Sequence, residues 1–267
     1  MTNDSDYLTR FGGIARLYGV DGLARLRKAR VTVVGVGGVG SWTVEALARS
    51  GVGHLTLVDL DDVCVTNINR QLPAMDGTVG RSKIDVLAER IQSINPECHV
   101  EQRLEFFTAA TANELLSIPC DGVVDAIDQV PNKCLLIAEC LRRNIPLVVC
   151  GGAGGRRDPT AIRVKDLALT SHDPLLAQVR YQLRHEHQFS AESTAWGVEA
   201  VFTTELPVFP QPDGSVCGVR PKGSHGVGLR LNCDAGVGAA TFVTGAVGFT
   251  AASVMIGRLA QLSPGLV

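Results

Sequence analysis

A glycine-rich turn, GVGGVG, is the part of this 267-residue chain best suited to chemistry. Its glycines, Gly35, Gly37, Gly38 and Gly40, follow the β-branched run 31–34 and precede a helix predicted at 41–50. Glycines let the backbone turn tightly and approach a phosphate, and the helix N-terminus attracts the anion. Asp59 ends the next apolar strand, 55–58, about 20 residues further on, where an acid binds ribose. The spacing predicts an adenine-nucleotide site; the alternative is a turn needed only for helix–strand packing.

The segment after Asp59 is unusually polar for a doubly wound sheet. It leaves the carboxyl end of a predicted strand, where such sheets bind ligands. Packing alone would not place so many amides and charges there, so we expect a functional segment. Its polar residues are Asp61, Asp62, Thr66, Asn67, Asn69, Arg70 and Gln71.

Lys83 and Asp128 are two further candidates for phosphate chemistry. Ser82 is a good N-cap, which puts Lys83 in the first turn of a helix, where the helix dipole disfavours a cation. Lys83 therefore reaches a phosphate or is a tolerated surface lysine. Asp128 ends the predicted strand 121–128, and its carboxylate suits Mg²⁺, which binds one or two carboxylates plus phosphates. Asp125 lies within that strand and is less well placed.

The elements that would position these residues alternate between strand and helix. This order predicts an α/β fold with a doubly wound, mostly parallel sheet and a C-terminal α+β extension. A second glycine-rich turn, 151–155, is either a substrate cradle or a connection into the extension. The segment 207–232, with Arg220, Lys222 and Arg230, is the best candidate for reaching a large substrate. Predicted strands are 31–34, 55–58, 99–102, 121–128, 145–150, 162–164 and 201–206; predicted helices are 7–28, 41–50, 82–94, 111–117, 132–143 and 174–187.

Composition bounds the function. A formal net charge of −2 argues against a protein that binds nucleic acid over its whole surface, so a nucleic-acid substrate would need a local basic patch. The N-terminus has no apolar core, and the eight cysteines form no CxxC pair, so we expect a cytoplasmic protein without structural zinc. The uncharged stretch 235–257 is long enough to span a bilayer, but its many small residues favour a buried core or interface helix. We therefore expect no stable membrane insertion.

Four separated motifs carry a family resemblance. GVGGVG, DLDDVCVTNINRQ, Lys83 and the strand-end DAID together resemble the ubiquitin-activating-type (ThiF/MoeB-like) adenylating superfamily. The resemblance implies a Rossmann-like adenylation fold. It divides the chain into a nucleotide-binding half, 1–155, and a substrate-binding and dimerisation half, 156–267, continuous as one globular unit. It also implies that Mg²⁺–ATP is bound and that the enzyme is a homodimer.

A narrower resemblance extends over nearly the whole chain. RFGGIARLYG, DDVCVTNINRQ, INPEC and GGAGGRRDPT are similar to the tRNA threonylcarbamoyladenosine dehydratases. The family implies that Asp59 binds ribose, that Asn67, Arg70 and Lys83 hold the triphosphate, and that Asp128 organises Mg²⁺. It further implies a tRNA substrate and a sulfur-relay partner, a cysteine desulfurase or sulfur acceptor. The expected reaction is adenylation of the threonyl carboxylate, followed by attack of the ureido oxygen of the same side chain.

The chain departs from the carrier-activating relatives at several points. Those relatives have an arginine near the N-terminus that reaches the partner subunit's ATP. Gly13 occupies that position here, and Arg16 is the candidate substitute. The two CxxC zinc-binding pairs of those relatives are absent from this chain. No cysteine can be assigned as a thioester nucleophile from the sequence, although Cys217 and Cys233 are candidates. The alternatives are adenylation of the C-terminal glycine of a ubiquitin-like sulfur carrier, an NAD-dependent dehydrogenase, and a non-catalytic nucleotide sensor.

Overall fold

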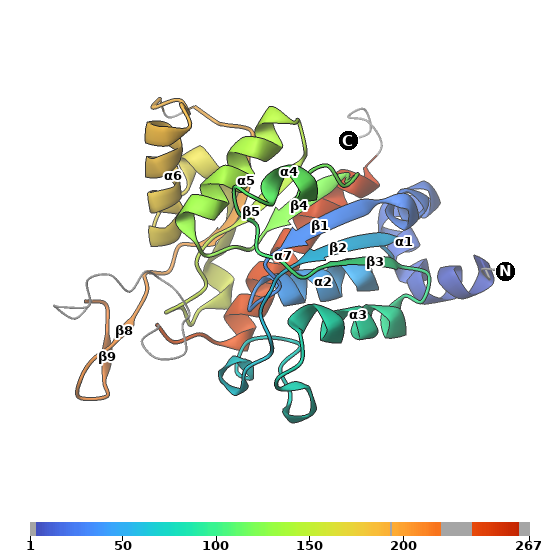
Figure 1. The fold of residues 1–267 in the computed structure, drawn as a ribbon, viewed down its shortest axis with the longest axis horizontal. Helices are drawn as coiled ribbons and strands as arrows, with labels where there is room; N and C mark the ends of the chain where they lie inside the picture. The colour runs from blue at the N-terminus through green and yellow to red at the C-terminus, as the bar shows by residue number, and fades with distance from the viewer. Residues whose placement is uncertain (1–3, 193, 220–236, 262–267) are drawn as a thin grey trace.

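A seven-stranded sheet forms the centre of the molecule in the computed structural model, which describes residues 4–192, 194–219 and 237–261 (Figure 1). The strand order is β3-β2-β1-β4-β5-β7-β6, and every neighbouring pair is parallel except β7 and β6. The sheet strands are β1 (Arg30–Val34), β2 (His54–Val58), β3 (His99–Arg103), β4 (Gly122–Asp125), β5 (Leu147–Cys150), β6 (Ile162–Asp166) and β7 (Glu199–Thr203); β8 (Phe209–Pro210) and β9 (Val216–Cys217) form a separate hairpin. The expected α/β class and mostly parallel sheet are confirmed.

Helices cover both faces of the sheet (Figure 1). One core, which includes Val33, Leu47, Leu87 and Met255, lies between the sheet and α2, α3 and α7. The other, which includes Val149, Ile137 and Leu176, lies between the sheet and α4, α5 and α6. Because both faces are covered, the central strands are apolar throughout rather than alternating. The helices are α1 (Asp4–Lys28), α2 (Gly40–Arg49), α3 (Lys83–Ile94), α4 (Ala112–Leu115), α5 (Val130–Arg142), α6 (Pro174–Glu186) and α7 (Thr241–Ala260), with short 3₁₀ turns at Val65–Asn67, Asp76–Thr78, Pro159–Ala161 and Leu167–Leu169.

Helix α7 packs the C-terminal part of the chain against α2 and α1. Gly248 lets it approach α2 closely, because a Cβ there would lie 2.5 Å from the Val39 carbonyl oxygen. Val247, Ala251 and Met255 are buried in the core. Among the described residues, α7 is the one helix long and apolar enough to cross a membrane, and half of its most apolar window is buried inside the protein. The small residues of 235–257 that α7 contains therefore serve helix packing.

Two predicted boundaries around the site are wrong. The strand predicted at 121–128 ends at Asp125, so Asp128 lies in a turn beyond the strand. The helix predicted to begin at Asn132 begins at Val130 with Gln129 as N-cap, because Pro131 fits the first helical turn. The connection between β4 and α5 is consequently only a few residues long, which fixes Asp128 close to the sheet edge.

Candidate active site

A cavity of about 710 Å³ lies at the carboxyl ends of β1, β2, β4 and β5. The chain leaves β1 toward β2 on one side, while β4 adjoins β1 on the other, so this is the switch point of the sheet, where such folds bind ligands. Of the residues predicted around the glycine turn, in the polar segment after Asp59 and for phosphate chemistry, Gly40, Thr66 and Asn69 do not line the cavity. The others do: Gly35, Gly37, Gly38, Asp59, Asp61, Asp62, Asn67, Arg70, Gln71, Lys83 and Asp128. Residues separated by up to 93 positions are thus brought to one cavity.

The glycine turn presents the N-terminus of α2 to this cavity. Gly40 is required for the turn itself, because a Cβ there would lie 1.8 Å from the Gly35 carbonyl oxygen. At Gly37, by contrast, a Cβ would meet only Gln71 Nε2, at 3.8 Å. The N-cap residue Val39 provides no side-chain cap. Uncapped backbone N–H groups beside an open glycine backbone suit a phosphate group.

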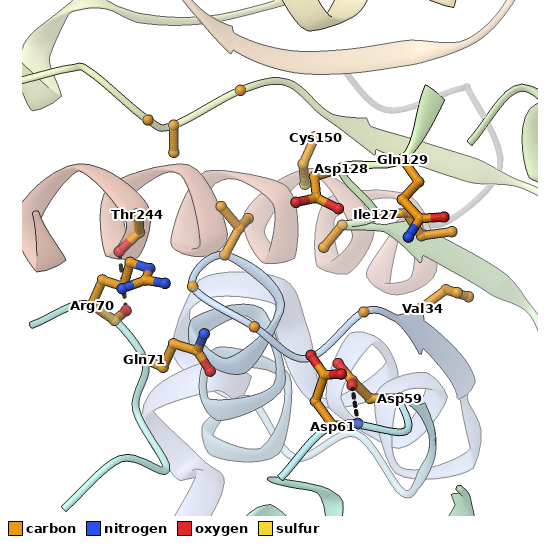
Figure 2. A pocket seen from close by; sticks show the side chains of 18 of the residues that line it. Val34, Asp59, Asp61, Arg70, Gln71, Ile127, Asp128, Gln129, Cys150 and Thr244 are labelled. Carbon is orange, nitrogen blue, oxygen red and sulfur yellow. Dashed lines mark hydrogen bonds between the residues drawn. The ribbon is translucent and has the colours of Figure 1, made fainter. Parts of the chain in front are cut away.

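Asp59 follows β2 and binds the glycine turn, because its Oδ2 accepts a hydrogen bond from Val36 N at 2.8 Å. Its Oδ1 accepts a hydrogen bond from Asp61 N at 2.9 Å (Figure 2). Burial raises the pKa of Asp59, and the charge of Lys83 and the two backbone hydrogen bonds oppose that rise. Each carboxylate oxygen has a second lone pair, so the group can still accept a hydroxyl hydrogen bond.

Lys83 lies in the first turn of α3, as predicted, with Asp85 N donating to Ser82 Oγ at 3.4 Å. Its side chain is only 5% exposed, and Nζ lies 2.8 Å from Asp61 Oδ2. The interpretation as a solvated surface lysine is therefore wrong. Asp61 is about half exposed, so this ion pair leaves the ammonium at the cavity wall rather than sealed in the core.

Arg70 is held from both ends. Its Nη1 donates to the Thr66 carbonyl at 2.7 Å and to Asn69 Oδ1 at 3.0 Å. Its own carbonyl accepts a hydrogen bond from Trp42 Nε1 at 3.1 Å. The same carbonyl accepts one from Thr244 Oγ1 at 3.2 Å (Figure 2). Thr244 on α7 was not predicted as a site residue, because its contact with Arg70 depends on tertiary packing alone.

Two amides complete this side of the cavity. Asn67 Oδ1 accepts from Cys64 N at 3.0 Å and so shapes the 3₁₀ turn that carries it. Gln71 lines the cavity beside Gly37. Both amides are nearly buried, with 6% and 9% of their surface exposed.

Asp128 lies across the glycine turn from Asp59 and is exposed to the cavity (Figure 2). Within the described ranges, no group of three acidic, histidine or cysteine side chains could hold a metal by itself. A single exposed carboxylate next to a phosphate site does fit Mg²⁺, which retains water and binds phosphate oxygens as further ligands.

Cys150 is poorly suited to nucleophilic catalysis. Burial raises the pKa of Cys150, which lines the cavity, to about 12, so its thiol is protonated near neutral pH. Cys217, in β9, is not among the lining residues, and Cys233 lies outside the described residues, as do Arg220, Lys222 and Arg230. Arg16 is an exposed residue of α1.

The second glycine turn also belongs to the cavity. Gly151, Gly152, Ala153, Gly154 and Arg156 line it, together with Pro174 and Leu175 at the start of α6. Asp173 fixes this turn, because its Oδ2 accepts from Gly152 N at 2.9 Å. Of the two readings of 151–155, a role in the site therefore agrees better with its position than a plain connection.

Comparison with known proteins agrees with this geometry. A sequence model of the ThiF family matches residues 12–261. A tRNA threonylcarbamoyladenosine dehydratase of Haemophilus influenzae is 48% identical over 97% of this chain and 96% of the relative, and that of Escherichia coli is 50% identical over 91% of each. The crystal structure of the E. coli enzyme TcdA in complex with ATP has a TM-score of 0.85 and 44% identity, covering 97% of this chain and 96% of the other.

Proposed function

The chain belongs to the ThiF family, and from that premise we propose that it is an ATP-dependent tRNA threonylcarbamoyladenosine dehydratase. One observation supports this most directly. The uncapped N-terminus of α2, the cations Lys83 and Arg70, and the carboxylate of Asp128 line a single cavity at the sheet switch point. That combination suits a nucleoside triphosphate whose α-phosphate is attacked by a carboxylate.

Different residues of the cavity bind different parts of ATP. Asp59 accepts a ribose hydroxyl, and Gly37 and Gly38 offer backbone N–H groups to the phosphates. Asn67, Arg70 and Lys83 hold the triphosphate, with Asp61 and Gln71 beside them. Asp128 would hold Mg²⁺, which when bound neutralises phosphate charge.

The first chemical step makes the substrate carboxyl a good electrophile. An oxygen of the threonyl carboxylate attacks the α-phosphorus of ATP, and the bond to the β-phosphate bridging oxygen breaks. Pyrophosphate leaves and a mixed acyl–AMP anhydride remains. Lys83 and Arg70 stabilise the charge that moves to the departing phosphates, and the backbone amides of the glycine turn orient the α-phosphate.

The second step closes a ring. The ureido oxygen of the same side chain attacks the activated carbonyl carbon, the C–O bond to AMP breaks, and an N–H proton of the ureido group is lost to solvent. The nucleoside loses the elements of water, and AMP carries away the carboxylate oxygen. This attack is intramolecular, so no enzyme nucleophile is needed, consistent with the high pKa of Cys150.

Adenylation of a sulfur-carrier protein is the second candidate. It uses the same cavity and the same first step, but its acceptor is the C-terminal glycine of a protein. The absence of CxxC pairs in this sequence speaks against it, as do the names of the relatives that match the chain over nearly its whole length.

The cellular setting is part of the proposal. We propose a cytoplasmic homodimer that acts on tRNA, with residues 156–267 serving substrate binding and dimerisation. A sulfur-relay partner follows from family resemblance alone.

Pyrophosphate release tests the proposal against the carrier alternative. Purified protein with Mg²⁺–ATP should release pyrophosphate when given tRNA bearing threonylcarbamoyladenosine. It should release none when given the same tRNA with unmodified adenosine. Release with a ubiquitin-like carrier protein, and none with either tRNA, would favour the second candidate.

A further inference from the structure

Arg156 is a buried cation in the cavity wall that has no counter-ion among the described residues. It follows the second glycine turn and is 3% exposed. Its Nη2 donates to the His172 carbonyl at 3.3 Å. Its Nε and Nη1 are buried and have no hydrogen-bond partner among the described residues. A buried, charged guanidinium whose N–H groups lack hydrogen-bond acceptors destabilises the folded protein. An anion bound to those N–H groups would offset that cost.

The neighbouring acids are occupied by backbone groups. Asp173 accepts from Gly152 N at 2.9 Å and from Leu176 N at 3.0 Å, one bond on each carboxylate oxygen. Glu205 Oε2 accepts from Arg157 N and Asp158 N, both at 2.8 Å. Neither forms an ion pair with Arg156 in the described part of the chain. Burial lowers the pKa of Arg156, and the charges of Asp173 and Glu205 oppose that shift without removing it.

Arg156 belongs to a different segment of the cavity wall from the residues proposed to hold the triphosphate. Lys83 and Arg70 belong to segments that follow β2, whereas Arg156 follows β5. Strands β1 and β4 lie between β2 and β5, so these two strands are about 14 Å apart at ordinary strand spacing. Arg156 and the triphosphate residues therefore line one cavity from two different segments, so a substrate group bound at Arg156 would share that cavity with ATP. Ala153, Pro174 and Leu175 add apolar side chains to the cavity lining around Arg156.

We propose that Arg156 binds the carboxylate of the threonyl group of the modified nucleoside and holds it for attack on ATP. This inference rests on the proposed function. A nearly buried guanidinium is reached only by a group that enters the cavity, and the carboxylate is the one anion of the nucleobase modification. The backbone phosphates of tRNA stay with the polynucleotide chain outside. Recognition of the carboxylate distinguishes modified from unmodified adenosine before any ATP is consumed.

The test compares two tRNAs and four proteins. Dissociation constants are measured without ATP for tRNA bearing threonylcarbamoyladenosine and for the same tRNA with that carboxylate converted to its methyl ester. The proteins are wild type, Arg156→Gln, Arg156→Lys and the control Arg157→Gln, whose side chain is 66% exposed and does not line the cavity. Binding of Mg²⁺–ATP and thermal melting are measured for each.

The inference predicts that wild type and Arg157→Gln bind the free acid about 10- to 100-fold more tightly than the ester, the range expected for charge-assisted hydrogen bonds. Arg156→Gln should bind both tRNAs equally and retain wild-type ATP affinity, and Arg156→Lys should keep part of the preference. A preference that persists in Arg156→Gln overturns the inference, and so does a loss of ATP affinity in that variant, which would place Arg156 in the nucleotide site.

Two further outcomes separate this inference from the proposed function. If Arg156→Gln does not fold, the ester comparison in wild type and in Arg156→Lys decides, and equal binding of acid and ester by wild type overturns the inference. Dehydration of the nucleoside by wild type is assayed in parallel. Absence of dehydration contradicts the proposed function and the inference with it, whereas dehydration without carboxylate preference contradicts the inference alone.

Discussion

Lys133 Nζ lies 2.9 Å from Asp125 Oδ1, and both side chains are completely buried. Lys133 Nζ also donates to the Ile127 carbonyl at 2.9 Å, and Asp125 Oδ1 accepts from Ile127 N at 3.0 Å. The pair therefore ties together both ends of the turn that leads from β4 to Asp128. Burial raises the pKa of Asp125, and the charge and hydrogen bond of Lys133 oppose that rise.

Removal of Lys133 should be strongly destabilising. Lys133→Met leaves a buried carboxylate without its cation, at a cost of about 3–5 kcal/mol in the free energy of unfolding. The double variant Lys133→Met, Asp125→Asn removes both charges and should recover most of that loss. Urea unfolding of the single and double variants measures this. Equal stability of the two variants would show that the charge pair is not what holds the turn.

Lys83→Ala and Arg70→Ala should abolish pyrophosphate release, because each removes a cation proposed to hold the triphosphate. Lys83→Ala should change the free energy of unfolding by no more than about 1 kcal/mol, since its partner Asp61 is half exposed. Arg81→Ala, an exposed cation two residues away that does not line the cavity, is the matched control. Wild-type turnover by either site variant, with unchanged melting, would remove that residue from the mechanism.

Asp128→Asn should weaken the dependence of activity on Mg²⁺, because a neutral amide is a poorer ligand for the ion than a carboxylate. A magnesium titration of turnover at fixed ATP should shift to higher concentration for this variant. It should not shift for Asp76→Asn, which alters an exposed carboxylate outside the cavity lining. An unchanged titration for Asp128→Asn would move the metal to another site.

Glu45 joins the two helices whose N-termini face the cavity. Its oxygens on α2 accept from Arg90 Nε at 2.6 Å and Arg90 Nη2 at 2.8 Å on α3. Burial acts to raise the pKa of Glu45, but the hydrogen bonds and charges of Arg90 and Arg49 outweigh it, and the pKa lies below its ordinary 4.5. At a pH between the folded-state and unfolded-state pKa of Glu45, the unfolded chain binds more protons than the folded chain. The stabilisation of the folded state by the Glu45 charge is therefore complete above pH 4.5 and is lost as the pH falls through the folded-state pKa.

Glu45→Gln should therefore lower the free energy of unfolding by about 1–2 kcal/mol at neutral pH. The difference from wild type should shrink as the pH falls below about 4.5. Urea unfolding across this range measures it, with the exposed Glu192→Gln as control. If the difference in free energy of unfolding between wild type and Glu45→Gln stays constant with pH, the charge of Glu45 does not contribute to stability.

The sequence predicts well which residues around the glycine turn line the cavity, because their signals are local. The glycines, Asp59 and Lys83 are each defined by a strand end or a helix start within a few residues, and those elements form as expected. Thr244 and Lys133 could not be found in this way. Thr244 reaches Arg70 only because α7 packs against α2, and Lys133 reads as an ordinary helical lysine until α5 packs over the end of β4.

In residues 156–267, too, the features that depend on tertiary packing could not be predicted from the sequence. Arg156 is visible in the sequence beside the glycine turn, but its burial and its unused donors depend on how β5, α6 and β7 pack together. The predicted start of α5 at Asn132 is two residues late, because Pro131 fits the first helical turn and Gln129 is the N-cap. The division at residue 155 stays a prediction, although β7 and β6 of the second half extend the sheet of the first.

Mass spectrometry of nucleosides tests the central claim most directly. The purified protein is incubated with Mg²⁺–ATP and tRNA bearing threonylcarbamoyladenosine, and the tRNA is then digested to nucleosides. The proposed function predicts loss of one water from that nucleoside, only when ATP is present. An unchanged nucleoside, together with ATP–pyrophosphate exchange on a carrier protein, would contradict it and assign the cavity to carrier activation.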